Sequence, residues 1–374
     1  MLSFWEKESF VKYDYIVVGS GLVGLSAAAA LTEKRPKKRV LVVERGVFPS
    51  GASTKNAGFA CFGNLTELLE DIENIGEQAT LELVEKRWKG LQILRKRLSD
   101  KQSGFVATGS HELILDKIDN ILPKINYLNQ LLKPIFQKNV FHLKENAAIA
   151  HFRFDTNTVK NLVFNELEGQ LHTGKLINNL LDLLQRKGVR FLNHTSVNEV
   201  REFGNKVEVL INNQIVLQAE KVIIANNAFA SQLFAELPLK AGRGQVLLTS
   251  PIKNLAIKGN FHFDKGFYYF RNIGKNQVLF GGGRNFDLES ETTTQMLTTE
   301  KIMDNLKEKL RTIILPKQNF EIEQTWAGIM GFTPDRKPIL KMHSPRIAIG
   351  VGMNGMGVAV GSEVGNTLAS MIEN

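Results

Sequence analysis

The chain has 374 residues, enough for two or three domains, each with a sizeable core. Hydrophobic residues make up 43% and charged residues 23% of the sequence, the balance of a folded globular protein, which excludes a disordered or fibrous chain. The formal net charge is +9, but Lys and Arg are spread along the chain without a basic stripe of interleaved aromatic residues, so no DNA partner is expected.

The single cysteine, Cys61, excludes an intramolecular disulfide framework and favours a reducing, cytoplasmic location. The seven histidines show no zinc-ligand spacing, so no metal site is predicted. The N-terminus lacks the apolar core of a signal peptide, and the longest uncharged run, residues 15–31, is broken by glycines. No transmembrane segment is therefore expected.

The first forty-odd residues have the pattern of a βαβ unit. Residues 14–19 and 39–44 are β-branched runs typical of buried parallel strands, and residues 21–32 are rich in Ala and Leu, which favours a helix. A complete G-x-G-x-x-G, formed by Gly19, Gly21 and Gly24, lies at the turn from strand to helix, and Glu44 ends the second strand. This pattern predicts an adenine dinucleotide with its pyrophosphate at the helix N-terminus and its ribose hydroxyls on Glu44.

The C-terminus carries a second glycine-rich turn. Residues 346–350 indicate a strand, residues 350–357 a turn, and residues 358–372 a closing helix. Only 17 residues follow Gly357, too few for a second strand with its own ribose carboxylate. We therefore expect this turn to serve the far end of the same cofactor.

The middle of the chain changes period twice. Helical spacing over 65–100 predicts a long helix or a pair of helices, and a leucine-lined helix is expected near 176–184. Strands, some with adjoining loops, are predicted at 105–115, 141–154, 189–193, 197–203, 206–210 and 214–225. An antiparallel pattern follows, with strands at 245–250, 259–263, 267–271 and 277–283 and a helix near 294–312.

This order predicts an α/β protein with an interleaved layout. A Rossmann-like dinucleotide-binding domain would gather residues 1–84, 156–239 and 324–374. A second, α+β domain with an antiparallel sheet would be built from 85–155 and 240–323.

Together with the fingerprint, further segments resemble the D-amino-acid oxidase family of FAD-dependent oxidoreductases, which includes the glycine and sarcosine oxidases. They are the sequences at 51–58, 168–175, 222–226, 243–245, 268–271, 281–284, 333–335 and 354–357. The resemblance runs in order along nearly the whole chain. It implies FAD in an extended pose, a substrate domain with an antiparallel sheet, and oxidation of a carbon–nitrogen bond in an amine or amino acid.

The resemblance also implies roles for particular residues. The cofactor's pyrophosphate would be held by the glycine turn and the adenosine end by Glu44 and Arg45, while the backbone of Val197 would meet the adenine. The other cofactor-binding positions are Leu22, Val23, Ser53, Thr54, Lys55, Asn56, Ala57, Ala225, Asn226, Gly328, Asn354, Gly355, Met356 and Gly357, of which the last four would lie at the pyrimidine edge of the flavin.

Two departures from the family pattern stand out. Cys61 is not at the C-terminal position used for covalent attachment in sarcosine oxidases, so non-covalent FAD is expected. Amino-acid oxidases of the family carry an arginine after their Trp-x-Gly that can clamp a substrate carboxylate, but here Met330 occupies that position. Tyr269 and Arg271, which share a strand face, are the predicted substitute anchors in the catalytic site, with Arg284 as the alternative.

The function predicted is that of an FAD-dependent amine or amino-acid oxidase or dehydrogenase. A substrate hydride would pass to flavin N5, the imine would be hydrolysed, and oxygen, a quinone or a carrier would take the electrons. Two alternatives remain: a flavin-dependent enzyme that modifies an aminomethyl group of RNA, and a non-catalytic flavin protein that works as a redox switch.

Overall fold

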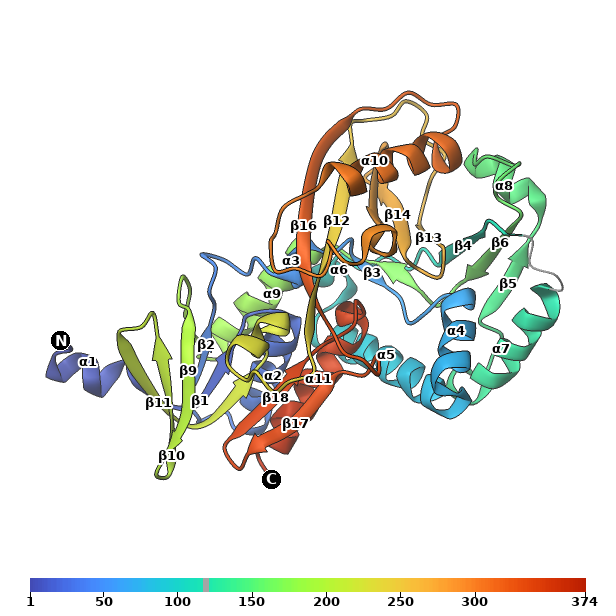
Figure 1. Ribbon diagram of the computed structural model, residues 1–374. Helices are drawn as coiled ribbons and strands as arrows, with labels where there is room; N and C mark the ends of the chain where they lie inside the picture. The colour runs from blue at the N-terminus through green and yellow to red at the C-terminus, as the bar shows by residue number, and fades with distance from the viewer. Residues whose placement is uncertain (117–120) are drawn as a thin grey trace.

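The computed structural model describes residues 1–116 and 121–374, and it contains two eight-stranded sheets and a two-stranded ribbon. Figure 1 shows the first sheet with both chain termini on one side of the molecule and the second sheet on the other. The ribbon is made of β3 (Phe59–Ala60) and β7 (Gly169–Gln170). The mixed α/β architecture predicted from the sequence is confirmed.

The first sheet combines parallel and antiparallel strands. Its strands are β17 (Ile339–Ser344), β18 (Ile347–Val351), β11 (Ile215–Ile224), β1 (Lys12–Val18), β2 (Val40–Val43) and β8 (Arg190–Leu192), with β10 (Lys206–Ile211) and β9 (Val197–Phe203) attached to β11. The sheet is parallel from β18 to β8, and its antiparallel strands, β17, β10 and β9, lie at the opposite side from β8. Strands β1 and β2 are apolar throughout their paired region because both of their faces are covered.

Helices cover one face of this sheet. They are α2 (Leu22–Lys34), α5 (Glu77–Arg97), α9 (Thr173–Arg186) and α11 (Gly357–Met371). Helices α2 and α11 pack so closely that a Cβ at Gly365 would lie only 2.6 Å from Ser26 Cβ. The opposite face is buried by β9, β10 and the short helix η1 (Asn227–Gln232).

The second sheet is antiparallel except for one parallel pair, β13 with β4. Its order is β16 (Ile322–Phe332), β12 (Lys240–Thr249), β15 (Gln277–Gly282), β14 (Tyr268–Ile273), β13 (Asn260–Phe263), β4 (Ser110–Ile114), β6 (Asn161–Asn165) and β5 (Phe141–Lys144). A core of stacked phenylalanines lies between this sheet, α8 (Asn146–Phe152), α10 (Glu300–Lys309) and the π-helical turn η3 (Leu310–Ile314).

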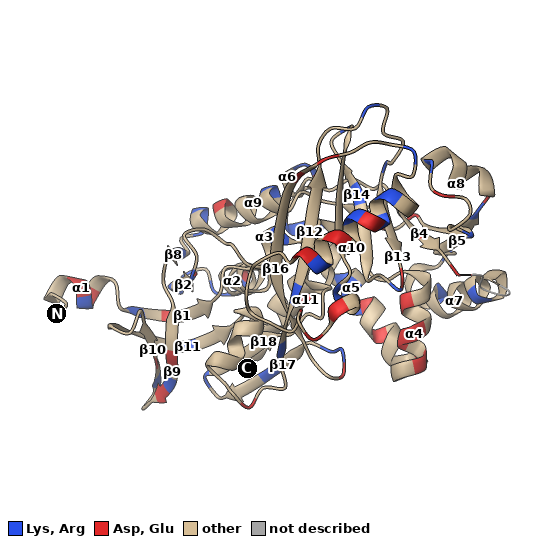
Figure 2. Ribbon diagram, turned by 45° about the horizontal axis from the view of Figure 1, so that its top comes forward, with Lys and Arg blue, Asp and Glu red and all other residues tan. Residues whose placement is uncertain are grey.

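The remaining helices are short or peripheral. They are α1 (Phe4–Ser9), α3 (Ala52–Lys55), α4 (Leu65–Ile75), α6 (Asp100–Ser103), α7 (Ile121–Phe136) and η2 (Arg284–Asp287). Basic and acidic residues are scattered over the surface elements, and acidic residues gather on α4 (Figure 2). Among the described residues, no helix is long and apolar enough to span a membrane.

The structure differs from the sequence-based expectation in several elements. Residues 146–152 form a helix where a loop was expected, whereas residues 65–100 form a pair of helices, one of the two arrangements predicted there. Strands β6 and β16 pair within the second sheet, although the predicted ranges counted them with the dinucleotide-binding domain. Each of these strands lies close to the point where the chain passes from the second sheet to the first. Residue periodicity does not reveal where that passage occurs. The exact domain boundaries stay a prediction.

A candidate cofactor and substrate site

A cavity of about 440 Å³ runs along the carboxyl ends of the parallel strands of the first sheet and reaches the second sheet. Among the predicted cofactor-binding residues, its walls include Gly19, Gly21, Leu22, Val23, Glu44, Arg45, Ser53, Asn56, Val197, Ala225, Asn226, Asn354, Gly355 and Gly357. The cavity brings the two glycine turns, far apart in sequence, to one site.

The geometry of the first turn requires glycine. Gly19 has φ +104°, a conformation that other residues rarely adopt, and a Cβ on Gly24 would lie 1.9 Å from the Gly19 carbonyl oxygen. Gly21 ends the turn against the cavity, and the Leu22 N–H at the start of α2 donates to Ser53 Oγ at 2.9 Å. The N-terminus of this 13-residue helix therefore opens on the cavity, where its dipole favours an anion.

Glu44 lies at the end of β2 and is held by three donors. The Ser20 N–H and hydroxyl donate to Oε2 at 3.1 and 2.6 Å, and the Gly46 N–H donates to Oε1 at 2.8 Å. A carboxylate has about four lone-pair positions, so it keeps room for a ligand hydroxyl. The guanidinium of Arg45, beside it, lies 4.0 Å from the centroid of the Phe229 ring.

The second turn closes the other end of the cavity. Asn354 and Gly355 have φ +51° and +84°, and the Asn354 side chain accepts the Thr333 N–H at 2.9 Å. Gly355, Gly357 and Val358 line the cavity where the 15-residue helix α11 begins. Because α11 has no side-chain cap, its N-terminal N–H groups remain available to a ligand.

Six predicted cofactor-binding residues lie outside the cavity walls. Gly24 packs α2 on the turn, and Met356 caps the start of α11. Thr54, Lys55, Ala57 and Gly328 support the loop that carries Ser53 and Asn56: the Thr54 hydroxyl donates to the Pro49 carbonyl, and the Lys55 carbonyl accepts the Trp326 indole N–H at 2.9 Å. Their contacts support the loop from behind, so any effect of theirs on a ligand is indirect.

The predicted substrate residues gather around a face of β12. A Cβ on Gly244 would lie 2.8 Å from Met330 Cε and 3.9 Å from the Tyr269 hydroxyl, and a Cβ on Gly242 would lie 3.2 Å from Arg284 Nη1. Since residues 242 and 244 share a strand face, the three side chains lie on the same side of the second sheet. Of these, Met330 lines the cavity. Burial raises the pKa of Tyr269 to about 12, so its phenol stays neutral.

The two candidate arginines have different surroundings. Arg271 is buried, and its Nη1 donates to the carbonyls of Gly58 and Leu171, each at 3.0 Å. Burial lowers its pKa to about 10. Arg284 is half-buried with its guanidinium 3.9 Å from the centroid of the Phe332 ring, and within the described chain no acceptor is hydrogen-bonded to it. Burial lowers the pKa of Arg284 as well.

Sequence reasoning missed residues that shape the substrate end. Met296 reaches the cavity from the segment after η2, and that segment is fastened by the buried pair of Arg243 and Glu291, with Nη2 and Oε1 2.6 Å apart. Gln245 joins them through a 2.8 Å bond to Glu291 Oε1. The segment 243–245 was noted only for its family resemblance, and nothing in the sequence links it to Glu291, which is 46 to 48 residues farther along the chain.

Comparisons with known proteins agree with this fold. The family model described as "FAD dependent oxidoreductase" (DAO) matches residues 14–371. The chain belongs to this family of FAD-dependent oxidoreductases.

Individual relatives are distant but cover most of the chain. A probable oxidoreductase, OrdL, of Haemophilus influenzae is 24% identical over 96% of this chain and 82% of its own length. The L-proline dehydrogenase of P. horikoshii superimposes with a TM-score of 0.78 at 20% identity, covering 97% of this chain and 93% of its own. The glycine oxidase of Geobacillus kaustophilus superimposes with a TM-score of 0.76 at 19% identity, covering 97% and 95%. These two structures establish a shared fold.

Proposed function

We propose that this protein oxidises the carbon–nitrogen bond of a small amine or amino-acid derivative, with FAD as its cofactor. The observation that carries the proposal is the continuous cavity from Glu44 to Met330, which has a helix N-terminus opening at each end. A shorter nucleotide would leave one of these two ends without a ligand.

The residues present fit an extended dinucleotide. Gly21, Leu22 and Ser53 form the cradle beside the N-terminus of α2, and Glu44 offers free lone pairs to ribose hydroxyls. Cys61 lies outside the cavity walls, and burial raises the pKa of its thiol well above the usual value. Both observations support non-covalent binding.

When bound, FAD supplies a hydride acceptor, and the oxidised substrate leaves as an imine that water hydrolyses. The chain's own residues have three tasks. Met330 lines the substrate end with apolar surface that excludes water, and Tyr269 lies on the same side of the second sheet. The N–H groups at the start of α11 favour negative charge at that end of the cavity. Arg284, which lacks an acceptor within the described chain, supplies a cation for a substrate carboxylate.

Anaerobic reduction tests the proposal. The purified yellow protein is mixed with a panel of amines and amino acids without oxygen, and the loss of the visible absorbance of the oxidised flavin is followed. We expect bleaching by a subset of the panel and formation of the corresponding carbonyl product. Re-oxidation by oxygen or by a quinone then distinguishes an oxidase from a dehydrogenase. A protein that no member bleaches, but that chemical reductant bleaches fully, would favour the non-catalytic redox switch.

A further inference from the structure

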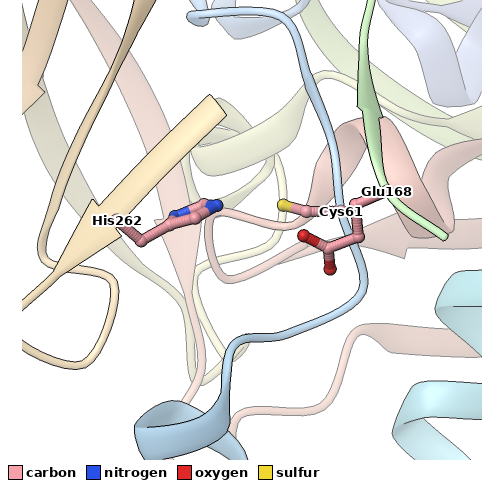
Figure 3. A group of neighbouring side chains, drawn as sticks. All are labelled: Cys61, Glu168 and His262. Carbon is pink, nitrogen blue, oxygen red and sulfur yellow. The ribbon is translucent and has the colours of Figure 1, made fainter. Parts of the chain in front are cut away.

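Three side chains outside the cavity converge on one point: Cys61, Glu168 and His262 (Figure 3). The Cys61 sulfur, a carboxylate oxygen of Glu168 and a ring nitrogen of His262 all lie within 4.8 Å of one another. Cys61 follows β3, Glu168 precedes β7, and His262 belongs to β13. The cluster therefore joins the segment that follows the cofactor loop to the second sheet.

His262 points into this cluster without a partner. Its side chain is on a residue only 7% exposed, and Nε2 has no hydrogen-bond partner within the described residues. Figure 3 shows the His262 ring extending from β13 toward the Cys61 sulfur. The ring nitrogen farther from the His262 backbone is the one that faces the sulfur. Burial lowers the pKa of His262 to about 4, so the imidazole is neutral at neutral pH, the form that binds metals.

Glu168 is oriented by hydrogen bonds, and among residues 1–116 and 121–374 no cation forms an ion pair with it. Its Oε1 accepts the N–H groups of Phe62 and Gly63 at 2.8 and 3.2 Å, and its Oε2 accepts the Ser110 hydroxyl. One lone pair of Oε2 remains free. The nearby cation Arg87 is paired with Glu67 at 3.2 Å. A fully buried carboxyl without a cation is costly to ionise, and burial raises the pKa of Glu168 to about 7.

We propose that Cys61, Glu168 and His262 bind a divalent transition-metal ion of the zinc type. A thiolate, an imidazole and a carboxylate are the donors that zinc prefers, and three protein ligands leave a fourth position for water. The ion's two positive charges balance the thiolate and the carboxylate, so the buried unit is neutral. On binding, the metal–sulfur bond replaces the S–H bond of Cys61 and a metal–oxygen bond replaces the O–H bond of protonated Glu168; both protons pass to solvent, and no electrons are transferred.

The position of the cluster defines what the ion does. None of the three ligands lines the cavity, so the ion takes no part in substrate chemistry. It links the segment just after Gly58 and Phe59 to β13, which pairs directly with the Tyr269 strand. The ion therefore fixes the cofactor loop relative to the substrate face. The sequence indicated no metal because the ligands are more than ninety positions apart and form no spacing motif.

Metal binding to the tag-free flavoprotein tests this proposal. Zn²⁺ is titrated against a chromophoric chelator, and bound zinc is counted by elemental analysis. We expect one tightly bound zinc per chain. Cys61→Ser, Glu168→Gln and His262→Gln should each weaken binding by more than about a hundredfold, and Ser110→Ala by about 10–100-fold, since it removes only a bond that orients a ligand. His111→Gln is the matched control, because His111 is also buried with an unpartnered ring nitrogen but lies outside the cluster.

X-ray absorption at the zinc edge of the unsubstituted protein gives a second measurement that does not depend on variant folding. One sulfur at about 2.3 Å and nitrogen or oxygen ligands at about 2.0–2.2 Å would support the site. Three results would each overturn the proposal: zinc bound without a sulfur ligand, zinc bound by Cys61→Ser with unchanged affinity, or a protein that takes no zinc from the chelator.

Discussion

Arg271 and Arg284 differ in what their guanidinium groups contact. Arg271 is the anchor favoured from the sequence. Its Nη1 donates to two backbone carbonyls, and these bonds hold the Gly58 loop and the segment before α9. Arg284 stacks on Phe332 beside the Gly242 and Gly244 face, without a hydrogen-bond acceptor in the described chain. A carboxylate arriving at this face would complete the bonding of Arg284 but would compete with existing bonds at Arg271. We therefore place the substrate cation at Arg284.

Replacing Arg284 tests that placement. Arg284→Ala is expected to slow flavin reduction by a carboxylate-bearing substrate at limiting concentration by about thirtyfold or more, because losing a buried charge partner costs about 2–5 kcal/mol. The same variant should oxidise an amine without a carboxylate almost normally. Stopped-flow reduction with matched substrates measures both rates.

Arg271→Ala is the control for this experiment. It should lower thermal stability and FAD retention by loosening the loop at Gly58, with losses of about 1–3 kcal/mol for the abandoned carbonyls. At saturating FAD it should show no preference between the two substrates. If instead Arg271→Ala alone discriminates against the carboxylate, Arg271 is the anchor and the placement at Arg284 is wrong.

His111 makes stability depend on pH. Burial lowers its pKa to about 4 from 6.5, so the folded state binds fewer protons than the unfolded state between these values. Its contribution is complete above pH 6.5 and is lost as the pH falls toward 4. On moving from pH 7 to pH 4, the unfolding free energy of the unsubstituted protein should fall by about 3 kcal/mol relative to His111→Gln. Urea unfolding at both pH values measures this difference, and a constant gap would contradict the assignment.

At the scale of elements, local patterns predicted the cofactor half well. Strands β1 and β2, helix α2 and helix α11 lie close to their predicted ranges, because apolar runs beside glycine turns specify them locally. Strands β6 and β16 pair within the second sheet although their residues fall largely in the ranges predicted for the dinucleotide-binding domain, because strand pairing between distant segments leaves no periodic signal. Helix α8 was expected as a loop: only seven residues long, it has too few turns to show a helical period.

The contact between α2 and α11 is a test at this scale. A Cβ at Gly365 would lie 2.6 Å from Ser26 Cβ and 2.7 Å from the Ala27 nitrogen, so Gly365→Ala must separate the two helices. We expect a loss of about 1–3 kcal/mol in unfolding free energy despite the better helix propensity of alanine. Gly174→Ala in α9 is the matched control, where the nearest atom is the tip of the His172 ring at 3.2 Å. Equal stability of the two variants would show that the helices are not in contact at Gly365.

Across the whole molecule, the cavity is assembled from segments near residues 19, 44, 53, 225, 330 and 355, and both sheets contribute to it. Its cofactor end could be predicted because glycine and carboxylate positions there are set by local backbone geometry. Its substrate end could not, because Met296, Met330 and the glycines of β12 come from distant segments that meet only when the second sheet forms. The metal cluster had no local signal for the same reason.

This assembly makes stability depend on a ligand that reaches both ends. Apoprotein given FAD at about a hundredfold excess over Kd should gain about 2.7 kcal/mol of unfolding free energy, measured by denaturant unfolding. ADP, which reaches only the Glu44 end, should stabilise less at equal concentration.

Glu44→Gln should weaken binding of both by about 1.5–3 kcal/mol, since it removes the charged acceptor that Ser20 and Gly46 orient, and excess FAD should restore turnover. Acid precipitation of the holoprotein should leave the yellow cofactor in the supernatant. Flavin that stays with the pellet would contradict non-covalent binding, and equal stabilisation by ADP and FAD would contradict a ligand that spans the cavity.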